Sequence, residues 1–257
     1  MGNFTLVSFT LNASRVSVGK LWSTIREETI VNAIVLASGG LDSSVTAAVA
    51  KRDGWDLYLL TVVYGQRHQV EVNCSKEVAA WLGAKDHTIL HLDLSGFGGS
   101  ALVGEGSVPK NRDEHERGQG IPATYVPARN TVFLSLALAY AEVVQAKSIF
   151  IGANILDYSG YPDCRPEFLL AFQEVARLGT KMGVEGETVE IKAPLLYQSK
   201  AQIIQQGMEL GVPFELTHSC YDPNEFGIAC GQCDSCLIRL EGFRQAGRED
   251  PIPYQIR

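Results

Sequence analysis

The fold of this chain is decided by residues 33–43, which read AIVLASGGLDS. The five apolar residues at 33–37 indicate a strand buried on both faces, as in a parallel sheet. The small residues that follow Ser43 are compatible with a helix, so Gly39 and Gly40 stand between a strand and a helix N-terminus. Glycine allows positive φ angles and close approach of backbone N–H groups to a ligand, and a helix N-terminus favours anions. The stretch therefore predicts a phosphate-binding loop.

This loop differs from a Walker A loop. The pattern G-x-x-x-x-G-K-[ST] does not occur, and the only Gly-Lys pair, Gly19-Lys20, is followed by Leu21. The plain alternative is an ordinary turn between a strand and a helix. The six residues SGGLDS resemble the pyrophosphate-binding loop of the ATP pyrophosphatase family, whose members attack the α-phosphate of ATP. The resemblance implies that ATP is bound by Leu36, Ala37, Ser38, Gly39, Gly40, Leu41, Asp42, Ser43, Ser44, Val45 and Thr46.

Composition limits the class of protein. A chain of 257 residues suffices for one large α/β domain, with or without an appendage. Its 46% hydrophobic and 20% charged residues are typical of a soluble globular protein. The net charge of −7 argues against binding of nucleic acid through a broad basic surface. No apolar stretch approaches the roughly 18 residues of a membrane-spanning helix. We therefore expect a cytoplasmic protein that binds small molecules rather than nucleic acid or membranes.

Residues 1–30 precede the first predicted strand and match no targeting pattern. Position 6 is Leu rather than Ser or Thr, which excludes the myristoylation pattern, and no charge precedes the apolar residues as it would in a secretory signal. We expect this segment to be a dispensable N-terminal extension.

Downstream of residue 33, strand and helix patterns alternate. Further strands are predicted at 57–63, 88–92, 148–151 and 189–191, and helices at 70–82, 130–146, 166–178 and 200–210. This alternation predicts a doubly wound, mainly parallel α/β sheet of the Rossmann-like kind, with helices on both faces. A glycine-rich connection at 95–127 separates the third strand from the long helix, and loops of that length are usually functional lids or disordered.

Four cysteines near the C-terminus form the second informative pattern, Cys220-x9-Cys230-x2-Cys233-x2-Cys236. This spacing brings four thiolates within reach of one centre, and four thiolates in a tetrahedral array form a closed structural Zn²⁺ site. Disulfides are a weaker alternative, because no secretory context exists and CxxCxxC is cramped for two bridges. An iron–sulfur cluster is the more serious alternative, since it also uses closely spaced cysteines. We expect one zinc ion per chain.

Several motifs, in unbroken order over roughly residues 33–245, carry a resemblance to one family. They read SGGLDSSVT (38–46), YGQRH (64–68), YVPARN (125–130), DYSGYPDCRPEF (157–168) and CYDP…CGQCDSC (220–236). Together they resemble the 7-cyano-7-deazaguanine synthase family. The chain departs from that family at His218, where the family usually has Trp before Ser-Cys, and we interpret this as a tolerated change.

The resemblance implies an ATP-dependent ligase that converts 7-carboxy-7-deazaguanine and ammonia to 7-cyano-7-deazaguanine in queuosine biosynthesis. It implies adenylated carboxylate and amide intermediates, Mg²⁺ accompanying ATP, and a homodimer. We divide the chain into an ATP-binding α/β domain, residues 31–216, and a C-terminal segment, residues 217–257, with the four-cysteine zinc site and a helix.

Four residues are candidates for acting on ATP or on protons. Asp42 is a candidate Mg²⁺ contact, with a helix N-cap as the alternative. Arg129 and Lys200 are candidates for steadying the nucleotide phosphates, and a solvated helix lysine is the plain alternative for Lys200. His68 is a candidate proton shuttle, or simply an exposed loop residue.

The candidate substrate residues are Tyr158, Tyr161 and Asp163. They follow a predicted strand, where an open α/β sheet binds its substrate. An aromatic ring of this loop would stack on the deazapurine, and Asp163 would accept hydrogen bonds from its amino and ring N–H groups. Alternatively, Asp163 caps the helix that begins at Pro166.

Two other functions fit parts of the pattern. Another ATP pyrophosphatase, either a tRNA sulfur-transferase or an amide synthetase, would share the loop. Sulfur transfer needs a reactive cysteine near ATP, and Cys164 lies in the predicted substrate loop. A non-catalytic, zinc-stabilised nucleotide-binding module would bind ATP without releasing pyrophosphate.

Overall fold

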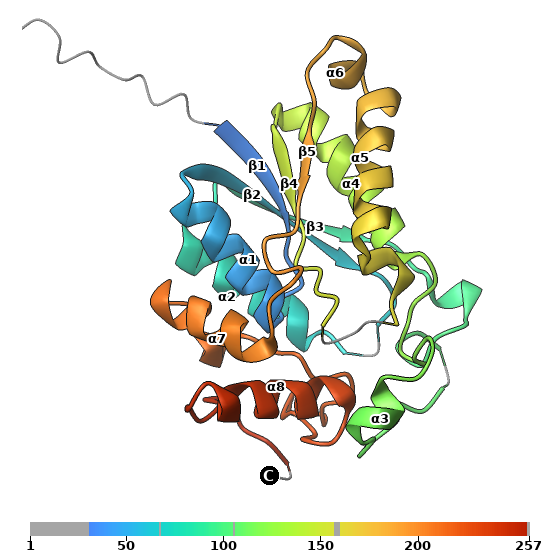
Figure 1. Cartoon of the computed structure of the whole chain (residues 1–257), viewed down its shortest axis with the longest axis vertical. Helices are drawn as coiled ribbons and strands as arrows, with labels where there is room; N and C mark the ends of the chain where they lie inside the picture. The colour runs from blue at the N-terminus through green and yellow to red at the C-terminus, as the bar shows by residue number, and fades with distance from the viewer. Residues whose placement is uncertain (1–30, 67, 105, 157–159, 256–257) are drawn as a thin grey trace, which may run out of the picture.

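A five-stranded parallel sheet lies at the centre of residues 31–66, 68–104, 106–156 and 160–255, which the computed structural model describes (Figure 1). The strand order is β3-β2-β1-β4-β5. The strands are β1 (Val31–Leu36), β2 (Trp55–Val63), β3 (Asp86–His91), β4 (Ser148–Phe150) and β5 (Glu190–Lys192). Every neighbouring pair is parallel, which confirms the predicted doubly wound α/β sheet.

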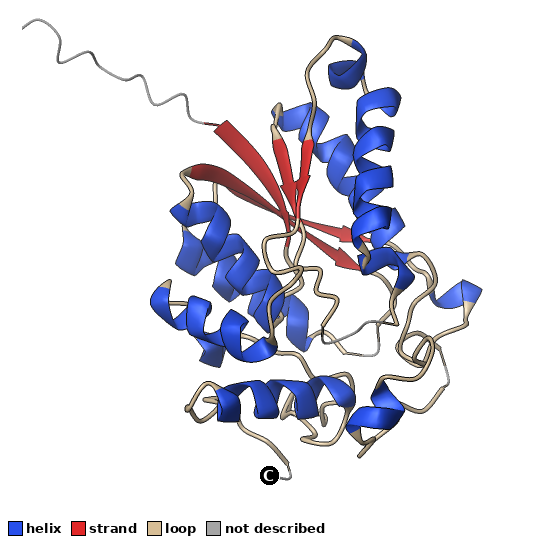
Figure 2. Ribbon diagram, viewed as in Figure 1, coloured by secondary structure: helices blue, strands red, loops and turns tan. Residues whose placement is uncertain are grey.

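Helices cover both faces of this sheet (Figure 2). Alternate residues of β1 belong to two separate hydrophobic clusters, because successive side chains of a strand point to opposite faces. Ala33 and Val35 share one cluster with α1 and α2, whereas Ile34 and Leu36 share the other with α4 and α5. The helices are α1 (Leu41–Arg52), α2 (Val70–Leu82), α4 (Arg129–Val144) and α5 (Pro166–Gly179).

Local sequence signals explain several helix ends. The α2 helix spans the predicted residues 70–82 and is followed by Gly83 in the left-handed region, with φ 60°. Pro166 opens α5 at a position where a missing N–H costs nothing. Ser199 caps α7 (Lys200–Glu209) in a capping box with Gln202.

The long connection at 95–127 packs against the rest of the protein. It contains the short elements η2 (Ser95–Phe97) and α3 (Glu114–Arg117), and Leu102 and Val108 are buried in the core. The Asn111 N–H donates to the carbonyl oxygen of Gln232 at 2.8 Å, beside the cysteines. The described part of this connection is thus anchored to the C-terminal segment.

The C-terminal helix extends the α1 side of the molecule. The α7 helix packs on α1, and α8 (Asp234–Gln245) packs on α7 (Figure 1). A Cβ atom on Gly242 of α8 would lie 2.3 Å from Cγ of Lys200, so the close contact of the two helices requires glycine. The remaining short elements are η3 (Pro162–Cys164), α6 (Lys181–Val184) and η4 (Phe214–Leu216).

Residues 1–30 lie outside the described residues, so their dispensability stays a prediction.

Candidate active site and cysteine cluster

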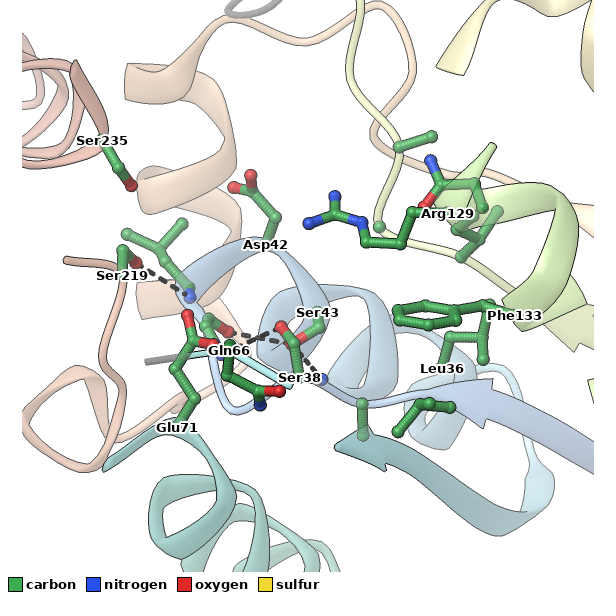
Figure 3. Close-up of a pocket in the computed structure, with 18 of the residues that line it drawn as sticks. Leu36, Ser38, Asp42, Ser43, Gln66, Glu71, Arg129, Phe133, Ser219 and Ser235 are labelled. Carbon is green, nitrogen blue, oxygen red and sulfur yellow. Dashed lines mark hydrogen bonds between the residues drawn. The ribbon is translucent and has the colours of Figure 1, made fainter. Parts of the chain in front are cut away.

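A cavity lies at the carboxyl ends of β1 and β4 (Figure 3). Its lining includes residues 36–43, which follow β1, and residues 151–154, which follow β4. The chain leaves β1 toward β2 on one side, and β4 pairs with β1 on the other, so this is the point where the strand order reverses. Open α/β sheets bind their ligands at such a switch point.

The phosphate loop, residues 38–43, has a geometry that only glycine permits at position 39. Gly39 has φ +81°, and a Cβ atom there would lie 2.1 Å from the backbone oxygen of Glu71. The Ser38 N–H donates to Oγ of Ser43 at 3.2 Å, and Oγ of Ser44 donates to the Gly40 carbonyl at 2.8 Å. The serines therefore fix the loop at the start of α1.

Asp42 and Lys200 form an ion pair at the edge of the cavity. The Lys200 Nζ lies 2.6 Å and 2.8 Å from the two carboxylate oxygens of Asp42. Lys200 is buried rather than a solvated helix lysine. The N-cap of α1 is Gly40, so Asp42 occupies the first turn and does not act as the cap.

Arg129 reaches the same cavity from the first turn of α4. Its guanidinium carbon lies 5.7 Å from the ring centroid of Tyr64 and 6.0 Å from that of Phe133. Cation–π attraction to both rings holds the charge in a low-dielectric site. Figure 3 shows Arg129 directed toward Asp42, and Lys200, the partner of Asp42, supplies a second cation to the same cavity.

The three predicted substrate residues have different positions. Tyr161 is buried, lines the cavity and has its hydroxyl 2.9 Å from Oγ1 of Thr124. Asp163 accepts the Asn130 N–H at 2.9 Å, in the first turn of α4. The alternative prediction, that Asp163 caps the helix beginning at Pro166, is wrong. The N-cap of α5 is Arg165, and its side chain makes no capping hydrogen bond. Tyr158 lies outside the described residues.

Several residues to which the sequence gave no individual role border the cavity, some of them within the quoted motifs. Glu71 comes from the first turn of α2, and burial raises its pKa to about 7 while Arg129 opposes the shift. Gln66 accepts the Tyr64 N–H at 2.8 Å, which fixes the amide beside the loop. The C-terminal segment contributes Ser219, Tyr221, Ser235, Ile238 and Arg239.

Two histidines lie together beside the loop. His68 lines the cavity and is half-buried, and its ring lies edge-on to that of His218 with centroids 5.8 Å apart. Burial lowers the pKa of His68, and lowers the pKa of His218 to about 4. The His218 N–H donates to the Gly39 carbonyl at 3.0 Å, so this residue supports the phosphate loop.

Cys164 lines the cavity as a protonated thiol. Burial raises its pKa to about 11, and the Asn130 side-chain amide lies 3.2 Å from its sulfur. Nucleophilic cysteines are instead thiolates in electropositive surroundings. This environment does not favour the sulfur-transfer alternative.

The four C-terminal cysteines form the cysteine cluster, Cys220, Cys230, Cys233 and Cys236. Their ligand atoms all lie within 4.8 Å of one another, and all four residues are buried. The sulfurs of Cys230 and Cys236 are 3.9 Å apart, and all four cysteines are free, so the disulfide alternative is wrong. Backbone N–H groups point at the sulfurs, including that of Cys230 to Cys220 at 3.2 Å and that of Cys233 to Cys230 at 3.3 Å. The cluster can hold a metal ion.

A buried ion pair attaches α8 to the chain end. Arg239 donates to both carboxylate oxygens of Asp250, at 2.7 Å and 3.0 Å, and to Oγ1 of Thr217 at 2.8 Å. Asp250 also accepts the Tyr254 hydroxyl at 2.6 Å. Because Arg239 also borders the cavity, the segment that carries the cysteine cluster forms one wall of the site.

Comparisons with known proteins identify the family. The family model described as queuosine biosynthesis protein QueC matches residues 32–247. The chain belongs to this family. The 7-cyano-7-deazaguanine synthase of Desulfatibacillum aliphaticivorans is 56% identical over 223 residues, covering 86% of this chain and 96% of that protein. That of Kineococcus radiotolerans is 55% identical and covers 87% of this chain and 97% of its own length. The resemblance found in the motifs is confirmed.

Solved structures are more distant. A predicted subunit of a tRNA methyltransferase from Methanocaldococcus jannaschii aligns over 88% of this chain and 94% of that chain, with 16% identity and a TM-score of 0.46. Among the described residues, every helix is too short or too polar to traverse a lipid bilayer.

Proposed function

We propose that this chain is a 7-cyano-7-deazaguanine synthase, an ATP-dependent ligase that converts 7-carboxy-7-deazaguanine and ammonia to the nitrile. One observation carries the proposal: in a chain of this family, the phosphate loop and the loop that follows β4 border the same cavity. ATP and a second small molecule can therefore meet at the switch point of the sheet.

Conversion of the carboxylate to the nitrile requires two activations by ATP, first of the carboxylate and then of the amide. A carboxylate is a poor acyl donor, so one of its oxygens attacks the α-phosphate of ATP, which gives an acyl-adenylate and pyrophosphate. Ammonia displaces AMP and leaves the amide. Loss of water from the amide needs a second activation of its oxygen, after which AMP leaves and the nitrile forms. Both activations build negative charge on phosphate, so positioning and fixed donors supply most of the rate enhancement.

The chain's own residues can position the phosphates of ATP and balance their charge. The phosphate loop at the N-terminus of α1 would bind pyrophosphate through backbone N–H groups, within the ATP-binding residues 36–46. Arg129 and Lys200 would balance the phosphate charge from the cavity wall, and Asp42 fixes the position of Lys200. Tyr161 would face the deazapurine, with Tyr158 as a further candidate. Asp163 would act mainly by fixing α4, and so Arg129, through its bond to Asn130.

Mg²⁺ would accompany ATP, and Asp42 is the carboxylate that would hold it. Mg²⁺ prefers oxygen ligands and is usually bound by one or two carboxylates together with substrate phosphates. The Asp42 side chain is 26% exposed and lies at the end of the phosphate loop, in the first turn of α1, so its donor chemistry fits the ion. The ion would neutralise phosphate charge.

The cysteine cluster would hold one structural zinc ion. Four sulfurs about 2.3 Å from a central zinc ion in a tetrahedron lie about 3.8 Å apart. The spacings of 3.9 Å and 4.0 Å fit that value, and the N–H groups aimed at the sulfurs favour thiolates. A cluster of several iron atoms would hold its cysteines farther apart. Purified protein should contain one zinc per chain, whereas stoichiometric iron and sulfide would contradict the assignment.

A cytoplasmic homodimer is the expected form of the enzyme. This inference rests on the family resemblance. Light scattering coupled to gel filtration should give twice the mass of the chain, and a monomer mass would contradict it.

Product analysis tests the proposed reaction. The purified chain is incubated with 7-carboxy-7-deazaguanine, Mg·ATP and ammonia, and the products are measured by mass spectrometry and nucleotide chromatography. We expect the nitrile, with the amide as a transient species, together with AMP and pyrophosphate. The amide as the final product, or ATP that persists while the acid is bound, would refute the synthase. ADP and phosphate would retain the ligase but contradict attack at the α-phosphate.

A further inference from the structure

Glu71 is a carboxylate in the cavity that has no assigned role in binding or activating phosphate. Asp42 and Glu71 are the two carboxylate residues that line the cavity within the described part of the chain. Both oxygens of Asp42 are held by Lys200. For the Glu71 carboxylate, the described residues provide neither a hydrogen bond nor an ion pair, and the side chain is half-buried at the cavity surface. Figure 3 shows it directed from α2 toward the space beside Ser38 and Ser219.

The position of Glu71 is fixed by the fold. Its backbone oxygen lies where a Cβ of Gly39 would have to be, so the first turn of α2 is in direct contact with the phosphate loop. The side chain starts from a helix of 13 residues that is packed on the sheet. A group held this way can meet a substrate in a defined geometry, which proton transfer requires.

We infer that Glu71 is the proton acceptor for the nitrogen of the substrate, an inference that rests on the proposed function. In the first half-reaction, ammonia attacks the acyl carbon of the adenylate. The C–N bond forms, the C–O bond to AMP breaks, and one nitrogen proton passes to the Glu71 carboxylate. In the second, the amide oxygen attacks the α-phosphate of another ATP, pyrophosphate leaves, and one of the two N–H protons passes to Glu71 and on to water. The C–O bond to AMP then breaks, and the last N–H proton passes to Glu71 as the nitrile forms. Water takes the proton from Glu71 between the steps.

The surroundings make this carboxylate a suitable base near neutral pH. Withdrawal from water raises its pKa to about 7, and the Arg129 cation on α4 keeps the pKa from rising further. A catalytic base works best with a pKa near the operating pH. His68 is a weaker base, because burial lowers the pKa of its imidazole below the usual 6.5. The other titratable or charged groups of the cavity are Asp42, Tyr64, Tyr161, Cys164, Lys200, Tyr221 and Arg239.

Separating adenylation from proton transfer tests the inference. Exchange of labelled pyrophosphate into ATP, dependent on the 7-carboxy substrate and without ammonia, reports the adenylate alone. In Glu71→Gln we expect this exchange to stay within about threefold of the native enzyme, while amide and nitrile formation fall at least about 100-fold. Glu71→Asp should recover part of the loss. The control is Glu77→Gln, an exposed position of the same helix, which should leave both rates unchanged.

The pH profile separates proton transfer from a structural effect. At constant free ammonia, the native rate of amide formation should rise with pH to a plateau, with a midpoint near the pKa of about 7. Glu71→Gln should lack this rise. Nitrile formation within about threefold of native in Glu71→Gln would overturn the inference, and so would an equal loss of pyrophosphate exchange. If the native enzyme itself shows no exchange with the 7-carboxy substrate, the proposed function fails first and this inference fails with it.

Discussion

Two ion pairs of this molecule differ in what surrounds them. Arg239 and Asp250 have side chains that are 2% and 0% exposed, and further bonds to Thr217 and Tyr254 occupy their remaining polar atoms. Asp42 and Lys200 are 26% and 10% exposed, and they face the cavity at the phosphate loop. One pair is saturated by protein groups, whereas the other remains accessible to a ligand.

The same contrast separates the two regions in which these pairs lie. In the C-terminal segment, the cysteine sulfurs receive backbone N–H groups and the cluster is closed to solvent. Around the cavity, Glu71 and Arg129 face open space. Saturated polar groups stabilise a fold, because an unpaired buried group would cost free energy. Charged groups at a cavity surface are available for chemistry. If this contrast holds, changes in the C-terminal segment should mainly lower stability, and changes at the cavity should mainly lower activity.

Loss of the cysteine cluster should have the largest effect. Cys233→Ala removes one of four ligands, and structural zinc contributes its binding free energy directly to folding, on the order of 10 kcal/mol in small zinc domains. We expect insoluble or unfolded protein with no bound zinc, measured by elemental analysis and circular dichroism. Cys74→Ala is the control, since Cys74 lies outside the cluster on α2, and it should keep its zinc. A folded, metal-free Cys233→Ala protein would remove the structural role from this region.

Breaking the saturated ion pair should come next. Asp250→Ala leaves the Arg239 guanidinium buried without its carboxylate, which typically costs about 3–5 kcal/mol. Urea unfolding should show this loss. The control is Glu241→Ala, which removes an exposed partner of Arg244 and should cost less than about 1 kcal/mol. Equal costs for the two variants would abolish the distinction between saturated and exposed pairs.

Much of the fold and part of the site were predictable from sequence because their signals are local. A buried strand, two glycines and a helix predict the phosphate loop, and four close cysteines predict the cluster. The sheet could be predicted because strand and helix periods alternate along the chain. Arg129 and Lys200 were candidates through their motif and helix positions, and both border the cavity.

The rest depends on contacts between distant segments. Ser235 and Arg239 line the cavity only because α8 packs on α7, and no local sequence pattern predicts that contact. Asp163 was assigned to the nearby helix at Pro166 or to the substrate, yet it bonds Asn130, which lies 33 residues earlier. In sequence, Glu71 is an ordinary acidic residue in the first turn of a helix, where it would complement the helix dipole. Only the packing of α2 on the phosphate loop distinguishes it.

Neutralising Asp42 should affect turnover more than stability. Asp42→Asn keeps the size and one acceptor oxygen but removes the charge that holds Lys200 and would bind Mg²⁺. We expect turnover to fall about 100-fold, equivalent to about 2.7 kcal/mol of activation free energy. The unfolding free energy should change by only about 1 kcal/mol. Steady-state kinetics and urea unfolding measure the two effects, and a stability loss as large as that of Asp250→Ala would place this pair with the structural one.

The smallest expected effect is a gain of stability, and it concerns Glu71. The pKa of this carboxyl rises from 4.5 in the unfolded chain to about 7 in the folded protein. Between these values the folded state therefore binds more protons, so the contribution of Glu71 to stability is complete below pH 4.5 and is lost as the pH rises to about 7. A full shift of this size corresponds to about 3 kcal/mol, which solvent in the cavity reduces to about 1–2 kcal/mol. Glu71→Gln carries no charge to bury. It should thus be about 1–2 kcal/mol more stable than the native protein at pH 8 and about equal to it at pH 4.5, as measured by urea unfolding at both values. A variant that is less stable at pH 8 would mean that the Glu71 charge stabilises the fold, and the cavity would then be as saturated as the C-terminal segment.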